Sequence, residues 1–204
     1  GPNAIWSEVI LETLADSRLA ELYTLVVYGS PETAAYYQHT LHDTEPAVFH
    51  PVESAADARR GRVNLVACGR TPAVNPGRVA PEAGRSAVEA LRMATADLKA
   101  GTLDALVTAP FDKQAVQSDD FRFTGHTEYF GSEFEGEPLM ILCSDVLRVG
   151  LVTKHLPVSE IASHISKEAI VRDLHLLRRS LKEDFGIVEP RIAVMALNPH
   201  AGDG

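Results

Sequence analysis

Short apolar runs alternate along this chain with segments in which apolar residues recur every three or four positions. Nearly continuous apolar runs are typical of strands covered on both faces, because such strands lose the polar alternation of a half-exposed sheet. Six runs predict strands, at 23–29, 62–69, 103–110, 138–145, 147–157 and 191–197. The fourth and fifth are joined by a turn near Asp145.

Helical spacing predicts helices at 7–16 and 85–101, another after Pro157, and one that starts at Ser166 and ends by Gly186. Ser30 and Pro31 open a further helix, as an N-cap and a first-turn proline. The alternation predicts an α/β fold, with a layered and mostly parallel sheet and flanking helices.

Composition narrows the class of protein. The 204 residues carry a formal net charge of −9 and no Lys/Arg run with interleaved aromatic residues, which argues against a nucleic-acid partner. No run reaches the roughly 18 apolar residues of a membrane span, and no secretion leader is evident. Cys68 and Cys143 each lie in an apolar run, so we expect two buried free thiols and a reducing cytoplasm.

Histidines lie at two of the predicted strand ends, where ligands bind in parallel α/β sheets. His155 lies near the end of the run at 147–157, and His200 follows the run at 191–197. Neutral imidazoles are good ligands for a divalent metal, although a catalytic metal usually takes about three protein ligands. Each could equally be a surface or turn histidine.

Two further segments carry candidate chemistry. In "FTGHTEYF", the His126 ring and the Thr127 hydroxyl can donate to phosphate or carboxylate oxygens, although Thr127 could simply be a helix N-cap. Lys113, after "TAPFD", could bind an anion or move a proton, or could be a solvated lysine. His39, His42, His50, His164 and His175 are interpreted as structural residues of helix faces or loops.

Together, "VTAPFDK", "FTGHTEYF", "VTKHLP" and "FGIVEPRIAVMALNPHAGDG" resemble the 4-hydroxythreonine-4-phosphate dehydrogenase family of vitamin B6 synthesis. The order and spacing match along nearly the whole chain. The resemblance implies a two-subdomain fold similar to isocitrate and isopropylmalate dehydrogenases. It also implies a homodimer with a shared active site. The implied reaction is NAD-dependent oxidation of 4-phosphooxy-L-threonine and loss of carbon dioxide to give 3-amino-2-oxopropyl phosphate.

The resemblance also assigns residues. Three histidines of the family hold a divalent metal (zinc, magnesium or cobalt), and two of them match His155 and His200. The His-Thr pair that contacts substrate matches His126 and Thr127. Lys113 is a candidate catalytic residue, and no NAD contact is assigned.

Family members are longer, so we expect residues 1–204 to be the N-terminal two-thirds of the family length. The chain taken alone should then lack activity. Ala4 and Trp6 stand where the family's N-terminal turn has glycines. Three alternatives stay open: a related dehydrogenase of 4-phospho-threonate or -erythronate, an inactive dimerising domain, and a metal-dependent hydrolase using Asp203.

Overall fold

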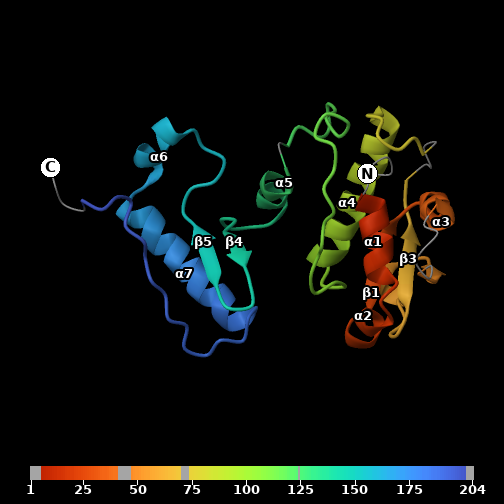
Figure 1. The fold of residues 1–204 in the computed structure, drawn as a ribbon, viewed down its shortest axis with the longest axis horizontal. Coiled ribbons are helices and arrows are strands. Elements are labelled where there is room, and N and C mark those ends of the chain that lie inside the picture. The colour runs from red at the N-terminus through yellow and green to blue at the C-terminus, as the bar shows by residue number, and fades with distance from the viewer. Residues whose placement is uncertain (1–5, 41–46, 70–73, 124, 201–204) are drawn as a thin grey trace. The chain divides into compact units, whose positions relative to one another are not determined.

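The computed structural model describes residues 6–40, 47–69, 74–123 and 125–200 (Figure 1). The chain divides into two compact units, Gly1–Glu135 and Gly136–Gly204. In the described parts, helices and strands alternate along the first unit around a parallel sheet, and the second unit contains two strands followed by two helices, so the predicted α/β class is confirmed.

A three-stranded parallel sheet forms the centre of the first unit. Its strand order is β1-β3-β2, with bounds Leu25–Gly29 for β1, Phe49–Val52 for β2 and Val63–Ala67 for β3. The runs at 23–29 and 62–69 therefore form strands as predicted. β2 was not predicted, and it contains His50, which was assigned to a helix face or loop. Its Pro51 is tolerated because β2 lies at the sheet edge, where a missing N–H is less costly.

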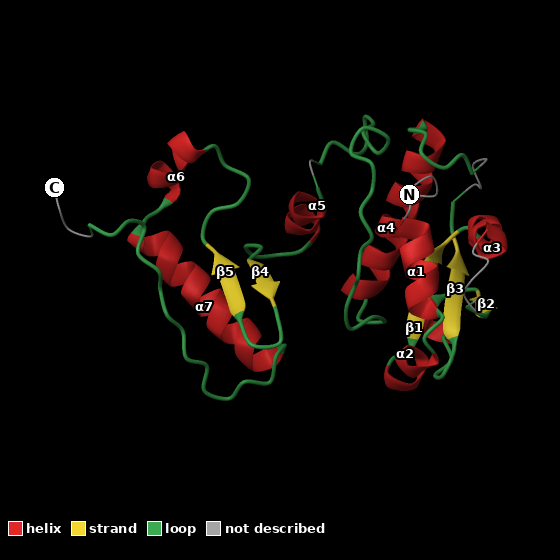
Figure 2. Cartoon of the chain, in the orientation of Figure 1, coloured by secondary structure: helices red, strands yellow, loops and turns green. Residues whose placement is uncertain are grey.

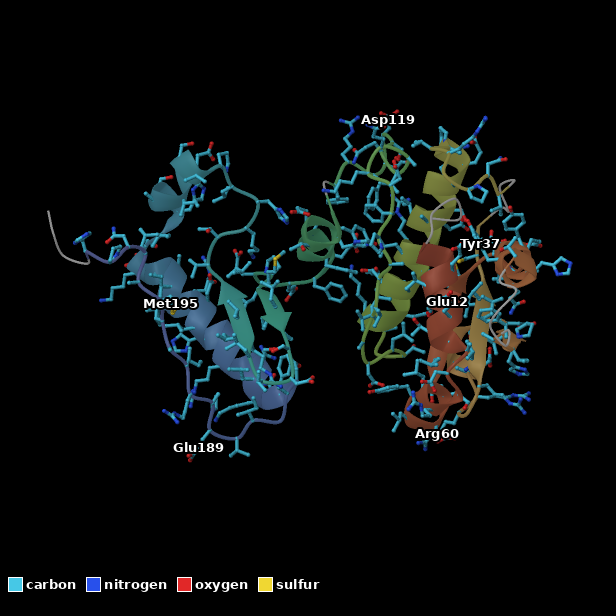
Figure 3. All side chains as sticks on the ribbon, viewed as in Figure 1. Glu12, Tyr37, Arg60, Asp119, Glu189 and Met195 are labelled. Atoms are coloured by element: carbon cyan, nitrogen blue, oxygen red, sulfur yellow. The ribbon has the colours of Figure 1, made fainter. Side chains whose placement is uncertain are left out.

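The central strand β3 is buried except at its last residue. Its one polar side chain, Asn64, is fully buried and is satisfied by hydrogen bonds. The Nδ2 group donates to the carbonyls of Leu25 (2.9 Å) and Arg59 (3.0 Å), and Oδ1 accepts from the Arg59 N–H (2.9 Å). Because a buried amide is costly unless paired, these bonds fix the turn before β3 against β1. Arg60, labelled in Figure 3, lies in that turn.

Five α-helices and one short 3-10 helix are described in the first unit. They are α1 (Trp6–Leu14), α2 (Ser17–Leu22), α3 (Pro31–Thr40), η1 (Ala55–Asp57), α4 (Pro81–Lys99) and α5 (His126–Glu133). Ser30 caps α3 as predicted, since its Oγ accepts the Thr33 N–H at 3.1 Å. α1 packs on α3, and α4 packs on β1.

Helix α4 begins four residues earlier than predicted, at Pro81, because proline suits the first turn of a helix. Its buried face includes Val88, Leu91 and Ala94. Val88 and Leu91 join Val116, Phe121 and Tyr129 in one apolar cluster. The side of α4 that faces this cluster therefore supports the loop between α4 and α5.

The second unit contains a two-stranded antiparallel sheet and two helices (Figure 1). The bounds are Met140–Cys143 for β4, Arg148–Leu151 for β5, Val158–His164 for α6 and Lys167–Glu183 for α7. The turn near Asp145 is confirmed. The N-cap of α7 is Ser166, whose Oγ accepts the Ala169 N–H at 3.1 Å. α7 packs closely on β5, because a Cβ at Gly150 would lie 3.3 Å from a methyl carbon of Leu177.

Two predicted strands do not form. Residues 103–110 and 191–197 have no strand assignment and are drawn as loop in Figure 2. A strand needs a hydrogen-bonded neighbour, and no described strand pairs with either segment. Apolar side chains of both segments are therefore exposed to solvent. Val107 is 95% exposed, and Met195, labelled in Figure 3, is 88% exposed.

The two thiols differ in environment. Both are free, but only Cys68 is buried, and burial raises the pKa of its thiol to about 11. The prediction that Cys143 is buried was wrong. β4 belongs to a two-stranded sheet, so fewer elements cover Cys143 than cover the end of the central strand β3. Among the described residues, no helix is long and apolar enough to cross a bilayer.

Candidate functional site

Residues 125–128 of the "TGHTE" segment form the start of helix α5. Gly125 is the N-cap residue with an extended backbone, and His126 and Thr127 occupy the first turn. The alternative in which Thr127 caps the helix is therefore wrong. Backbone N–H groups in a first helical turn have no partner within the helix, and with the helix dipole they attract anions. Both side chains thus lie where a phosphate or carboxylate could bind.

A ring contact places the "TAPFDK" segment beside this helix start. The Phe111 ring and the His126 imidazole have centroids 4.2 Å apart and planes inclined at 44°. On its own helix, His126 stacks with Phe130 at 6.3 Å and 22°. The two motifs that carry the predicted substrate chemistry therefore lie together in the first unit.

The surroundings of His126 favour its neutral form. Partial burial among aromatic rings lowers the pKa of the imidazole below its usual 6.5, because desolvation penalises the charged ring. Near neutral pH the ring therefore offers one N–H donor and one nitrogen acceptor.

Lys113 lies in a turn rather than directly after a strand, so the strand-end placement predicted for it was wrong. The turn is held by Asp112, whose Oδ1 accepts the backbone N–H groups of Gln114 (2.9 Å) and Ala115 (2.8 Å). Helix α4 presses on the same turn, since a Cβ at Gly84 would lie 1.7 Å from the Ala115 carbonyl oxygen. Lys113 itself is exposed, two residues from the ring that touches His126.

His155 belongs to the second unit, in the loop after β5. The strand ends at Leu151, earlier than the predicted run at 147–157, so the predicted position of His155 at the strand terminus was wrong. Its backbone is left-handed, with φ 51°, and among the described residues it is the one non-glycine position with a positive φ. Such a conformation costs roughly 1 kcal/mol or more in a non-glycine residue and is often found at functional sites. The side chain is exposed.

His200 is also exposed, and its backbone N–H donates to Asn198 Oδ1 at 2.9 Å. Because no strand forms at 191–197, its predicted position at a strand tip was wrong. Within the described ranges, no group of three His, Cys, Asp or Glu side chains could hold a metal ion. Neutral imidazoles suit a divalent metal in their chemistry, but the described residues do not place His155, His200 and a third ligand in one group. Asp203 lies outside the described residues.

Solved structures share this fold. A 4-hydroxythreonine-4-phosphate dehydrogenase from Klebsiella pneumoniae matches with a TM-score of 0.84 and 28% identity, over 98% of this chain and 61% of that chain. One from Burkholderia phymatum matches with a TM-score of 0.85 and 26% identity, over the same shares. The fold is accordingly that of the isocitrate/isopropylmalate dehydrogenase-like α/β proteins, as the resemblance implied.

The sequence comparisons point to the same family as the solved structures. The chain belongs to the family described as pyridoxal phosphate biosynthetic protein PdxA, whose sequence profile matches residues 21–204. A 4-hydroxythreonine-4-phosphate dehydrogenase of Bacteroides thetaiotaomicron is 45% identical, over 99% of this chain and 56% of the relative. Another, of Acidithiobacillus ferrooxidans, is 47% identical over 52% of this chain and 32% of the relative. The chain thus spans about half the length of the first of these relatives.

Sequence reasoning missed the aromatic partners of His126. In the sequence, Phe111 is part of the segment "TAPFDK", and Phe130 is the last residue of "FTGHTEYF". The spacing of Phe130 four residues after His126 does predict a contact on one helix face. The contact from Phe111 depends on how the loop between α4 and α5 folds back.

Proposed function

We propose that this chain forms part of an NAD-dependent and divalent-metal-dependent 4-hydroxythreonine-4-phosphate dehydrogenase. This enzyme would oxidise and decarboxylate 4-phosphooxy-L-threonine. The proposal is carried by the relative of that name, which is 45% identical over 99% of this chain. The position of the "TGHTE" segment at a helix N-terminus supports it, because the proposed substrate carries a phosphate and a carboxylate.

His126 and Thr127 would bind the anionic end of the substrate. The neutral imidazole donates one N–H, the Thr127 hydroxyl donates a second hydrogen, and the unpaired N–H groups of the first turn of α5 add a favourable dipole. The exposed ammonium of Lys113, in the adjacent turn, would add a positive charge or move a proton.

His155 and His200 would hold the divalent metal, each through a neutral imidazole nitrogen. Such a metal, when bound, acts as a Lewis acid on the substrate oxygen and lowers the pKa of the hydroxyl group. We propose that the third ligand and the NAD contacts come from outside the length that this chain spans, within a cytoplasmic homodimer.

The test uses a protein containing residues 1–204 within its complete reading frame, beside the 204-residue chain alone. Each is mixed with NAD, a divalent metal and 4-phosphooxy-L-threonine, and the absorbance of reduced NAD is followed. The complete protein should turn over and the 204-residue chain should not. Preference for 4-phospho-erythronate would assign the related sugar-acid activity, and no turnover of either substrate by the complete protein would refute the dehydrogenase proposal.

Thr127→Val in the complete protein tests the substrate site. Loss of one hydrogen bond to a charged group costs roughly 1.5–3 kcal/mol, so substrate affinity should fall by about tenfold to a hundredfold. Thr102→Val, at an exposed loop position, is the matched control and should bind substrate like the parent. Equal affinities for the two variants would remove Thr127 from the site.

A further inference from the structure

An aromatic cluster fills the space between α4 and the start of α5. Phe121 is fully buried at its centre, and its ring contacts those of Phe111 (6.1 Å), Phe123 (5.2 Å) and Tyr129 (5.5 Å). Phe111 and Phe123 have similar places in the cluster, since both are partly buried and both pack on Phe121. They differ in whether the ring contacts His126.

Phe111 contacts His126, whereas the recorded ring contacts of Phe123 are with Phe121 and Tyr129. With Phe130 as the other neighbour, the His126 imidazole touches one ring from the loop and one ring from its own helix. Ring contacts of this kind restrict rotation of the imidazole and replace water around it. The direction in which its N–H points therefore depends on Phe111.

Burial is the largest cause of the lowered pKa of His126, ahead of the positive charge of the N-terminal amino group. On the loop, Asp112 is engaged by two backbone N–H groups, and Lys113 is exposed. On α5, Glu128 is exposed and its carboxylate folds toward Gly125, 3.0 Å from the position of a Cβ there. Further along, Glu133 pairs with Lys99 of α4 at 2.5 Å.

We propose that Phe111 is a positioning residue, whose ring holds the His126 imidazole in the orientation that meets the substrate's anionic end. The proposal rests on the proposed function only for the identity of that ligand. Phe111 acts through His126 and does not touch the substrate. A ring at position 111 is needed for this, whereas an aliphatic side chain would fill the core without restraining the imidazole.

The first experiment needs no ligand. The histidine rings are labelled with carbon-13, and the pKa of His126 is followed by NMR in the parent chain, with His126→Gln to assign its signal. In the parent, the pKa of His126 should lie below 6.5. Phe111→Leu should move it toward 6.5, because the smaller leucine leaves part of the imidazole open to water. Phe111→Tyr, which keeps the ring, should restore the parent titration.

Phe123→Leu is the matched control. It removes a ring of the same size from the same cluster, so it should lower stability about as much as Phe111→Leu does while leaving the His126 titration unchanged. If Phe111→Leu and Phe123→Leu shift that titration equally, or if neither shifts it, Phe111 has only a structural role and the proposal is overturned.

The second experiment measures the affinity of the complete protein for 4-phosphooxy-L-threonine by calorimetry. Phe111→Leu should weaken binding about fivefold, the effect of losing good geometry in one hydrogen bond, and Phe123→Leu should not. One outcome is that Phe111→Leu shifts the His126 titration while His126→Gln binds the substrate as tightly as the parent. The substrate role of His126 then fails. If His126→Gln weakens binding and Phe111→Leu does not, the positioning role fails while the proposed function stands.

Discussion

Replacement of Gly84 by alanine should loosen the turn that carries Lys113. Gly84 lies on the buried face of α4, where the helix meets the backbone of the loop. A Cβ at this position would lie 1.7 Å from the carbonyl oxygen of Ala115, 2.3 Å from its carbonyl carbon and 2.9 Å from the nitrogen of Val116. All three atoms belong to the backbone, so no side-chain rotation can relieve the overlap.

The helix and the turn would have to separate by about 1.7 Å to reach ordinary van der Waals contact at 3.4 Å. Overpacking of this kind typically costs about 1–3 kcal/mol, and we expect the upper end because backbone faces backbone. Alanine in a helix interior recovers about 1 kcal/mol relative to glycine. The net loss in the free energy of unfolding should be about 2 kcal/mol.

Urea unfolding followed by circular dichroism measures this loss. With a slope of about 2 kcal/mol per molar, the midpoint should fall by about 1 M. Hydrogen exchange should also become faster in residues 112–121. Gly29→Ala is the control, because a Cβ there meets no atom within 4 Å, and its stability should stay within about 1 kcal/mol of the parent. A Gly84→Ala chain as stable as the parent, with unchanged exchange in the turn, would show that α4 does not press on this backbone.

Other predictions concern the histidines and the thiols. His155→Ala and His200→Ala should each weaken cobalt binding by the complete protein in a metal titration, and parent-like affinity would remove that residue from the ligand set. His155→Gly should be about 1 kcal/mol more stable than His155→Ala in urea, because glycine adopts φ 51° without strain, and equal stability would contradict the left-handed backbone. A thiol reagent near neutral pH should modify Cys143 quickly and Cys68 only after unfolding, since Cys68 is buried with a pKa of about 11. The free energy of unfolding should fall as pH drops below 6.5, because the folded chain resists protonation of His126. The fall should be smaller in His126→Gln, and an identical pH profile would refute the lowered pKa.

The amino-acid pattern by itself was enough to predict two kinds of element: those held by contacts between neighbouring residues, and strands that are completely buried. The apolar run of β3, the Ser30 cap of α3 and the Ser166 cap of α7 could each be identified from a few neighbouring residues. The motif "TGHTE" likewise indicated a helix start through Thr127 as a possible cap, although the structure has Gly125 as the N-cap, two residues earlier. These features need little knowledge of the rest of the chain.

Pairing and side-chain contact between distant segments were decided only by the tertiary structure. The runs at 103–110 and 191–197 have the composition of strands, but a strand forms only where another strand completes its hydrogen bonds, and none described does so. Sequence also gave no sign that Phe111 would reach His126, because their contact depends on α4 meeting the loop at Gly84, where the missing side chain lets the two backbones approach. Local propensity fixes an element, whereas the environment of a functional side chain is set by residues that only the folded chain brings near it.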